Sequence, residues 1–237
     1  DELGAAFSSA RFDASVAERT FTVWCGDTLA VEALPGIAAC LVTEAPGITV
    51  RAVSGLRTAA LDELARGEVD LVLDAFTDAA PPFRLRALAS ERFVTVVPRA
   101  SPRLNPEERA AAAAGERVPL SLESFLAFPH VLHSVDRGGR GMVDDALTAQ
   151  GLGRRVCAVV PYFLAIPAVV AAADACATVP ERVARRIPAA LALACFEPPV
   201  PMPTLTLSAV WHERTDNLPA HVWFRELVLR AGLGDGL

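Results

Sequence analysis

The chain has 237 residues, 52% of them hydrophobic, and a formal net charge of −6 at pH 7. All 22 basic residues are arginine and they form no basic stripe, so we expect the chain alone not to bind nucleic acid. Its longest weakly polar run, Ala165 to Ala173, is too short for a membrane span of about 20 residues.

The ends and the cysteines indicate the setting of the chain. It begins with Asp1-Glu2, without a signal peptide or an initiator Met, which suggests a fragment or a processed product. The five cysteines are odd in number, form no CxxC pair and lie in apolar segments, namely Cys25, Cys40, Cys157, Cys176 and Cys195. We interpret them as reduced thiols of a cytoplasmic protein, packed in cores, and expect no disulfide or zinc site.

The first part of the chain alternates strands and helices after a linker-like segment, 1–19. The predicted elements are a strand at 21–25, a helix at 28–44, a strand at 48–53, a helix at 57–66 ended by Gly67, and a strand at 69–73. Pro35 is expected to begin a second helical segment after one short turn. The alternation predicts parallel βαβ units with right-handed crossovers.

The second part repeats this alternation after a strand at 92–98. Residues 99–119 are interpreted as an exposed insertion with a short surface helix at 110–114. Next come a helix capped by Ser121 and running through Phe128, a strand at 130–134, a Gly-rich loop at 138–141 and a helix at 142–150 ended by Gly151. They are followed by a strand at 154–160, a helix at 164–173, a strand at 175–179 and a helix from Pro180. The last predicted elements are a strand at 191–196, a stiff connection at 197–203, a strand at 205–211 and a helix at 220–231.

These elements predict an α/β fold of two Rossmann-like βα subdomains. Subdomain I is discontinuous, 20–90 plus 205–237, and subdomain II is the insert at 91–204, with the chain crossing at 91–98 and 195–206. A protein of two such lobes is expected to bind its ligand in a cleft at the carboxyl ends of the strands.

Gly26-Asp27-Thr28 stands where the first strand meets the first helix. Gly26 permits a tight turn, Asp27 can cap the helix, and Thr28 offers a hydroxyl beside the free amides of the first turn. Asp27 can serve only as a cap or also as a ligand contact. Other strand ends are expected at the same cleft: Ser54-Gly55, Asp74-Ala75-Phe76, His133-Ser134, Tyr162-Phe163 and Val179-Pro180.

Several longer stretches, in order, resemble one family. They include FTVWCGDTLAVEALPGIAACLVTEAPGITVRAV, LDELARGEVDLVL and WHERTDNLPAHVWFREL, and the resemblance covers about residues 20–231. The chain is similar to the effector-binding domain of LysR-type transcriptional regulators, in the branch of nodulation and aromatic-degradation regulators. The resemblance implies a type II periplasmic-binding-protein-like fold with two crossing strands and a small-molecule effector in the cleft. It also implies DNA binding through an N-terminal winged helix-turn-helix outside this chain.

The resemblance also implies residue roles and an assembly. Effector contacts would come from Asp27, Thr28, Ser54, Asp74, Phe76, His133, Ser134, Tyr162, Phe163 and Val179, with Pro180 in the wall. The helix after Pro35 would pack against the helix near 142–150 of a second copy, giving homodimers and, in the full protein, tetramers.

Asp74 departs from the family, which has Gly at this position. A second carboxylate beside Asp27 disfavours an anionic effector unless Arg57 or Arg140 pairs with it. We therefore expect an effector that is aromatic and either neutral or a hydrogen-bond donor. The alternative for Asp74 is a helix cap or a solvated side chain.

Other functions are less well supported by the residues. His130 and His133 point to opposite sides of a strand and are not expected to share a metal, and GGRGM at 138–142 lacks the spacing of a P-loop. Asp144 and Asp145 are interpreted as solvated, Trp211 as a core residue, and His212 as structural or in contact with the hinge or the ligand. No cofactor is expected and no catalytic set is evident. A stand-alone solute-binding protein of a transport system, and an enzyme on a similar scaffold, remain the alternatives.

Overall fold

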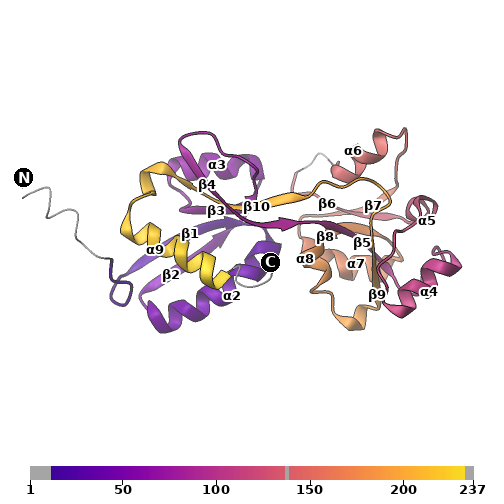
Figure 1. The fold of residues 1–237 in the computed structure, drawn as a ribbon, viewed down its shortest axis with the longest axis horizontal. Helices are drawn as coiled ribbons and strands as arrows, with labels where there is room; N and C mark the ends of the chain where they lie inside the picture. Colours follow the sequence, from indigo (N-terminus) through magenta and orange to yellow (C-terminus); the bar gives the residue numbers. More distant parts are fainter. Residues whose placement is uncertain (1–11, 137–138, 233–237) are drawn as a thin grey trace, which may run out of the picture. The chain divides into compact units, whose positions relative to one another are not determined.

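The computed structural model describes residues 12–136 and 139–232 (Figure 1). The chain divides into two compact units. Unit 1 comprises Asp1–Ala89 and Thr206–Leu237, and unit 2 comprises Ser90–Leu205. Among the described residues, no helix has both the length and the apolar character that a membrane crossing requires.

Unit 1 is built on a five-stranded sheet with the order β2-β1-β3-β10-β4. Strand β1 pairs in parallel with β2 and with β3, whereas β10 is antiparallel to β3. The elements are β1 (Arg19–Cys25), α2 (Asp27–Glu44), β2 (Ile48–Val53), α3 (Arg57–Arg66), β3 (Leu71–Ala75), β4 (Phe83–Glu91), β10 (Leu205–His212), η3 (Glu213–Thr215), α9 (Pro219–Leu227) and η4 (Val228–Gly232).

Alternate residues of β1 contribute to two cores, one on each face of the sheet. Phe21, Val23 and Cys25 pack with α2, α9 and η4 on one face, and the ring of Phe21 stacks on that of Phe224. Trp24 packs with α3 on the other face. The period-2 alternation of a strand therefore places Cys25 and Trp24 on opposite sides of the same sheet.

Helix α2 runs through Pro35 without a break, so the predicted second segment is wrong. Its buried residues Leu29, Ala33, Ile37 and Leu41 recur every four positions and keep one stripe on the sheet. Pro35 itself lies on the exposed side of the helix, away from this stripe. Packing of the apolar stripe thus outweighs the local cost of the proline.

Unit 2 contains two small sheets. Strand β5 lies between β8 and β9, antiparallel to both, and β6 pairs in parallel with β7. The elements are β5 (Phe93–Pro98), α4 (Pro106–Ala114), α5 (Leu122–Ala127), β6 (His130–His133), α6 (Met142–Thr148), β7 (Val156–Val160), η1 (Phe163–Ala165), α7 (Ile166–Ala173), β8 (Ala177–Pro180), α8 (Glu181–Ala184), η2 (Ala189–Leu191) and β9 (Leu193–Phe196). A parallel bridge from His130 to Cys176 joins the two sheets.

The segment predicted as an exposed insertion belongs to the core of unit 2. Leu104 and Ala112 are buried in one cluster with Phe125 and Leu147. Asn105 caps α4, and Glu108 is buried, where it accepts hydrogen bonds from Asn105 N and Ser124 Oγ. The alanine run therefore has a buried side, which its composition alone does not reveal.

The structure corrects three further expectations. The expected parallel pairing is incomplete, because β10 makes the sheet of unit 1 mixed and the β8-β5-β9 sheet of unit 2 is entirely antiparallel. Strand β4 was not predicted, and its alternation of apolar and basic residues covers only Phe83 to Arg86. Cys157, expected in a core, is exposed on β7. Most other predicted elements are present with shifted ends, and Ser121 caps α5 as predicted. Part of the predicted Gly-rich loop, 137–138, lies outside the described residues.

Candidate functional site

The predicted site residues of unit 1 gather at one edge of its sheet. Strands β2, β1 and β3 are neighbours and parallel, so their carboxyl ends meet there, with Trp24 opposite Val53 and Cys25 opposite Leu73. This edge carries Asp27, Thr28, Ser54, Asp74 and Phe76.

Asp27 is the first residue of α2, and the N-cap is Gly26, so the prediction of Asp27 as the cap is wrong. Its Oδ1 accepts a hydrogen bond from Thr28 N at 3.0 Å, and its charge lies at the positive end of the helix. Thr28 is buried, and its Oγ1 has no hydrogen-bond partner among the described residues. Asp27 therefore stabilises the helix start, while Thr28 carries an unsatisfied hydroxyl.

Asp74 lies within β3, and Arg57 of α3 partly balances its charge. The distance from Arg57 Nε to Asp74 Oδ2 is 3.8 Å, and the Arg57 guanidinium lies 5.0 Å from the centre of the Phe76 ring. Burial, and secondarily Asp74, raises the pKa of the Cys25 thiol to about 11, so this thiol stays protonated. Ser54 is exposed after β2. The Arg57 pairing removes much of the argument against an anionic effector.

Trp24 belongs to the same edge, although the sequence pattern did not single it out. Its side chain is 4% exposed, and Nε1 has no hydrogen-bond partner in the described part of the chain. Gly55, in the turn between β2 and α3, lies close to Trp24 Nε1. A methyl group added to the Cα of Gly55 would be 3.8 Å from this nitrogen. The only sequence signal was the position of a Trp two residues before the Gly26 turn.

In unit 2, four predicted residues gather at the carboxyl ends of β6 and β7. His133 and Phe163 stack, with ring centres 3.6 Å apart and planes 9° apart. Ser134 N donates to Val160 O, and Ser134 Oγ donates to Asp136. Tyr162 is 57% exposed. Val179, by contrast, is fully buried in the core of unit 2 and exposes no surface to a ligand.

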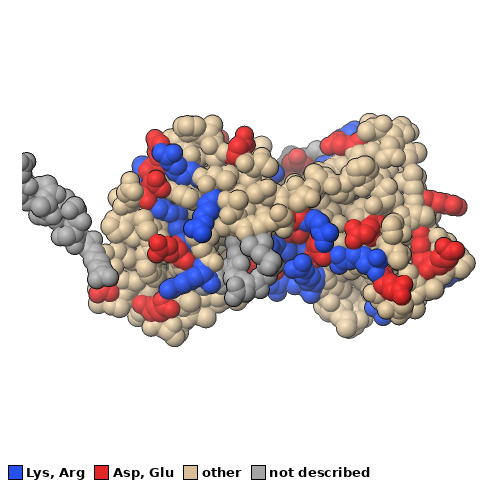
Figure 2. Space-filling model, viewed as in Figure 1, with Lys and Arg blue, Asp and Glu red and all other residues tan. Residues whose placement is uncertain are grey.

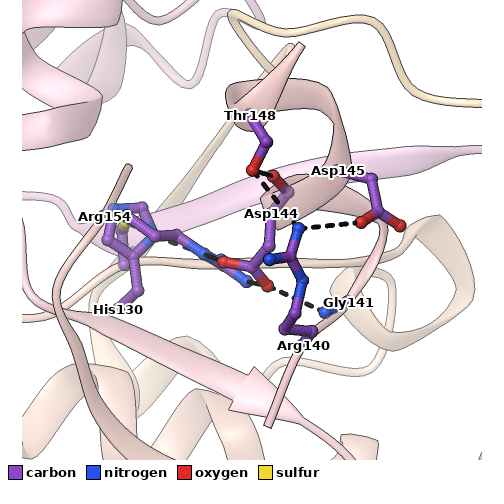
Figure 3. A network of polar contacts seen from close by, with 8 residues as sticks. His130, Arg140, Gly141, Asp144, Asp145, Thr148 and Arg154 are labelled. Atoms are coloured by element: carbon purple, nitrogen blue, oxygen red, sulfur yellow. Dashed lines mark hydrogen bonds and ion pairs between the residues drawn. The ribbon is translucent and has the colours of Figure 1, made fainter. Parts of the chain in front are cut away.

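A buried polar network in unit 2 connects Asp144 of α6 with His130 of β6 through Arg154 (Figure 3). Arg154 donates from Nε and Nη2 to the two oxygens of Asp144, both at 2.8 Å, and its side chain is only 2% exposed. Asp144 also accepts from Gly141 N. The prediction that Asp144 is solvated is therefore wrong. Asp145 is exposed and pairs with Arg140.

His130 is the buried end of this network. Its Nε2 lies 2.9 Å from the carbonyl oxygen of Phe125, which can only accept, so Nε2 carries the proton. Nδ1 then accepts from Cys176 Sγ at 3.2 Å or Arg154 Nη1 at 3.4 Å. Burial and the charge of Arg154 lower the pKa of His130 to about 4. The ring is neutral at pH 7 and structural.

The remaining titratable side chains of the described residues form no metal site. No group of three His, Cys, Asp or Glu side chains within residues 12–136 and 139–232 is placed to hold a metal. His212 Nδ1 accepts from Arg214 N and the His212 ring packs on Phe83, while Trp211 is partly buried and donates to Asp216. On the face shown in Figure 2, acidic side chains lie beside most of the basic ones.

Comparison with known proteins decides the family. The family model described as the LysR substrate binding domain matches residues 14–232. This chain belongs to the LysR substrate-binding domain family. The curated relatives include the transcriptional activators NagR of Ralstonia sp, 27% identical over 91% of this chain and 68% of the relative, and NahR of Pseudomonas putida, 27% identical over 92% and 68%. The regulator SyrM of Rhizobium meliloti is 32% identical over 84% of this chain and 57% of its own length.

Solved structures of LysR regulators agree with this membership. The probable transcriptional regulator PA0477 of Pseudomonas aeruginosa has a TM-score of 0.80 and 26% identity, covering 98% of this chain and 74% of that one. The regulatory domain of MexT from the same organism has a TM-score of 0.70 over 90% and 98%, and at 24% identity it shows the fold alone. The α/β, type II periplasmic-binding-protein-like fold is confirmed. The chain is the effector-binding domain of a LysR-type transcriptional regulator, and the transport alternative has no support.

Proposed function

We propose that the effector of this LysR domain is a small aromatic compound bound at the carboxyl ends of the strands. The observation that carries the proposal is the His133–Phe163 stack with the exposed Tyr162 beside it. Flat side chains that present their faces at a strand end bind an aromatic ring by stacking. In unit 1, Thr28, Ser54, Asp74 and Phe76 supply the corresponding edge, with Asp27 at the helix start.

A thermal-shift panel of phenols, hydroxybenzoates, aromatic amines and flavonoid-like compounds tests the proposal. A ligand at about 100 times its dissociation constant stabilises the native state by about 2.7 kcal/mol, which is a measurable rise in Tm. Thr28→Ala and Tyr162→Ala are expected to abolish the rise. Val159→Ala is the matched control, since Val159 is an exposed apolar residue of the same unit on β7. A panel in which no compound raises Tm would refute the aromatic effector.

The domain acts by binding and not by catalysis in this proposal, and it works in the cytoplasm. The relatives support both points, because they are transcriptional regulators. LysR regulators bind DNA through an N-terminal domain, here a winged helix-turn-helix that precedes this chain in the full protein. The effector shifts the population of two states of the domain, by as much as its affinity for them differs, and the linker transmits that shift to the DNA-binding domain.

We also propose that the domain forms a homodimer, in which α2 of one copy packs on α6 of the other, and that full-length regulators assemble into tetramers. Val42 on α2 is 78% exposed and Met142 at the start of α6 is 40% exposed. A second copy that covered these two side chains would remove their apolar surface from water.

A further inference from the structure

Two buried polar atoms of unit 1 lack a hydrogen-bond partner among the described residues, Trp24 Nε1 and Thr28 Oγ1. Buried polar groups in native proteins are nearly always paired, so each such atom requires an explanation. A threonine hydroxyl can donate or accept, but an indole N–H can only donate. Trp24 therefore specifies what its missing partner must be: a hydrogen-bond acceptor.

The cover over Trp24 is thin on the side of the turn between β2 and α3. Ser54, Gly55 and Leu56 are all exposed, and Gly55 has no side chain to fill the space beside Nε1. Phe76 packs against the same cluster of side chains as Trp24. An aromatic ring with an acceptor at its edge matches these neighbours, because the ring contacts Phe76 while the acceptor reaches Nε1.

The start of α3 favours a negatively charged acceptor at this place. Helix α3 begins at Arg57 without a side-chain cap, and its first turn has no acidic residue. The positive end of an uncapped helix attracts anions. Arg57 adds a positive charge, which Asp74 balances only in part, since Arg57 Nε and Asp74 Oδ2 are 3.8 Å apart.

Resting on the proposed function, we propose that Trp24 determines the polarity of the effector: its Nε1–H donates to a carboxylate or carbonyl oxygen carried by an aromatic ring, as the exposed turn 54–56 shifts aside. The effector is thus an acceptor, opposite to the polarity expected from Asp74 in the sequence.

Calorimetric titration with benzoate and with aniline tests the polarity. Trp24→Phe keeps an aromatic ring and removes the N–H, and we expect it to raise the Kd for benzoate about tenfold or more. The matched control is Trp211→Phe, because Trp211 Nε1 already donates to Asp216 at 2.8 Å. Trp211→Phe should leave the Kd for benzoate unchanged. Unchanged binding in Trp24→Phe, or binding of aniline in preference to benzoate, would overturn the inference.

The indole resonances of the ¹⁵N-labelled protein provide a readout that does not depend on affinity. Benzoate should move the Trp24 Nε1–H signal downfield, as expected for a new hydrogen bond, and leave the Trp211 signal in place. Denaturant unfolding of Trp24→Phe checks that the variant is folded. If benzoate raises the Tm of the wild type while the Trp24 signal stays fixed, the partner is a buried water or none: the inference is refuted and the proposed function stands. If no aromatic compound binds the wild type, both are refuted.

Discussion

Asp144 and Asp145 are neighbours in sequence but have opposite environments. Asp144 pairs through both oxygens with a guanidinium that is almost fully buried, while the Asp145 side chain is 74% exposed. Adjacent residues of a helix point in different directions, so the two side chains cannot share one environment. Here Asp144 faces the core of unit 2 and Asp145 faces the solvent. Which of the two faces the core is determined by Arg154, ten residues further along, and the local sequence does not contain that information.

Replacing Asp144 is expected to be costly. Asp144→Ala leaves the Arg154 charge buried and unpaired, and the expected loss is about 3–5 kcal/mol of unfolding free energy. Asp145→Ala is the matched control and should change stability very little, since exposed ion pairs contribute little. Urea unfolding measures both variants. Equal effects of the two substitutions would mean that the Asp144–Arg154 pair is not buried in solution.

His130 predicts a pH dependence of stability. Its pKa is lowered to about 4 in the folded state, from 6.5, so the unfolded chain binds more protons between these values. Stability should therefore fall as the pH falls through this window, by up to about 1.4 kcal/mol per pH unit from this group. His130→Asn should have a flatter profile between pH 6.5 and 5. Urea unfolding of the wild type and of His130→Asn over this range measures the two profiles. Subtracting one profile from the other cancels the contribution of His221, whose pKa is lowered by burial and which both proteins contain. Parallel profiles would contradict the prediction.

At the scale of secondary structure, α4 shows how a helix rich in alanine is held in place. Asn105 Oδ1 accepts from Glu108 N, and Glu108 Oε2 accepts from Asn105 N, both at 2.9 Å. This capping box satisfies two amides at the helix start that have no partner within the helix. Gly115 ends the helix in the left-handed conformation with a φ of 72°.

Loss of this cap should destabilise the domain measurably. Asn105→Ala is expected to cost about 1 kcal/mol of unfolding free energy, because the amide of Glu108 loses its acceptor. Glu107→Gln is the control in the same first turn, where the side chain is exposed. Guanidinium unfolding of both variants checks the prediction, and a cost confined to Glu107→Gln would contradict it.

The sequence predicted elements well where periodicity was strong and failed where tertiary contacts decide. The repeated strand–helix pattern of unit 1 located β1, β2 and α3 almost to the residue. It missed β4, where the alternation of apolar residues with Arg84 and Arg86 ends at Ala87-Leu88. It also broke α2 at Pro35, because the packing of Ile37 and Leu41 on the sheet lies outside local propensity.

At the scale of the whole chain, the order and spacing of weak motifs predicted the family, which the comparisons confirm. The site was predictable only in outline. The strand pattern predicted that His133, Tyr162 and Phe163 follow strand ends, which they do, but whether they bind a ligand stays a prediction, and Val179 lies in the core. The Trp24 N–H, which has no partner among the described residues, depends on packing around β1 that no motif records.

Dimerisation is testable at this scale. Val42→Arg places a charge on the exposed side of α2 and should convert a dimer into a monomer that is still folded, because Val42 contributes little to the core of its own chain. Val16→Arg, at a residue that is 77% exposed outside α2, is the control and should remain dimeric. Light scattering coupled to size exclusion gives the masses. A wild type with the mass of one chain would refute the dimer for this domain.

The neighbouring strands β4 and β10 carry the chain out of unit 1 and back into it. The chain leaves unit 1 after Ala89 and returns to it before Thr206, so both passages lie on neighbouring strands of one sheet. Unit 1 also has hydrophobic cores of its own. In the chain, unit 2 is thus an insertion between two neighbouring strands of the sheet of unit 1. A short turn that joins β4 directly to β10 should yield a miniature domain, in which the Trp24 edge can be studied apart from the His133–Phe163 stack.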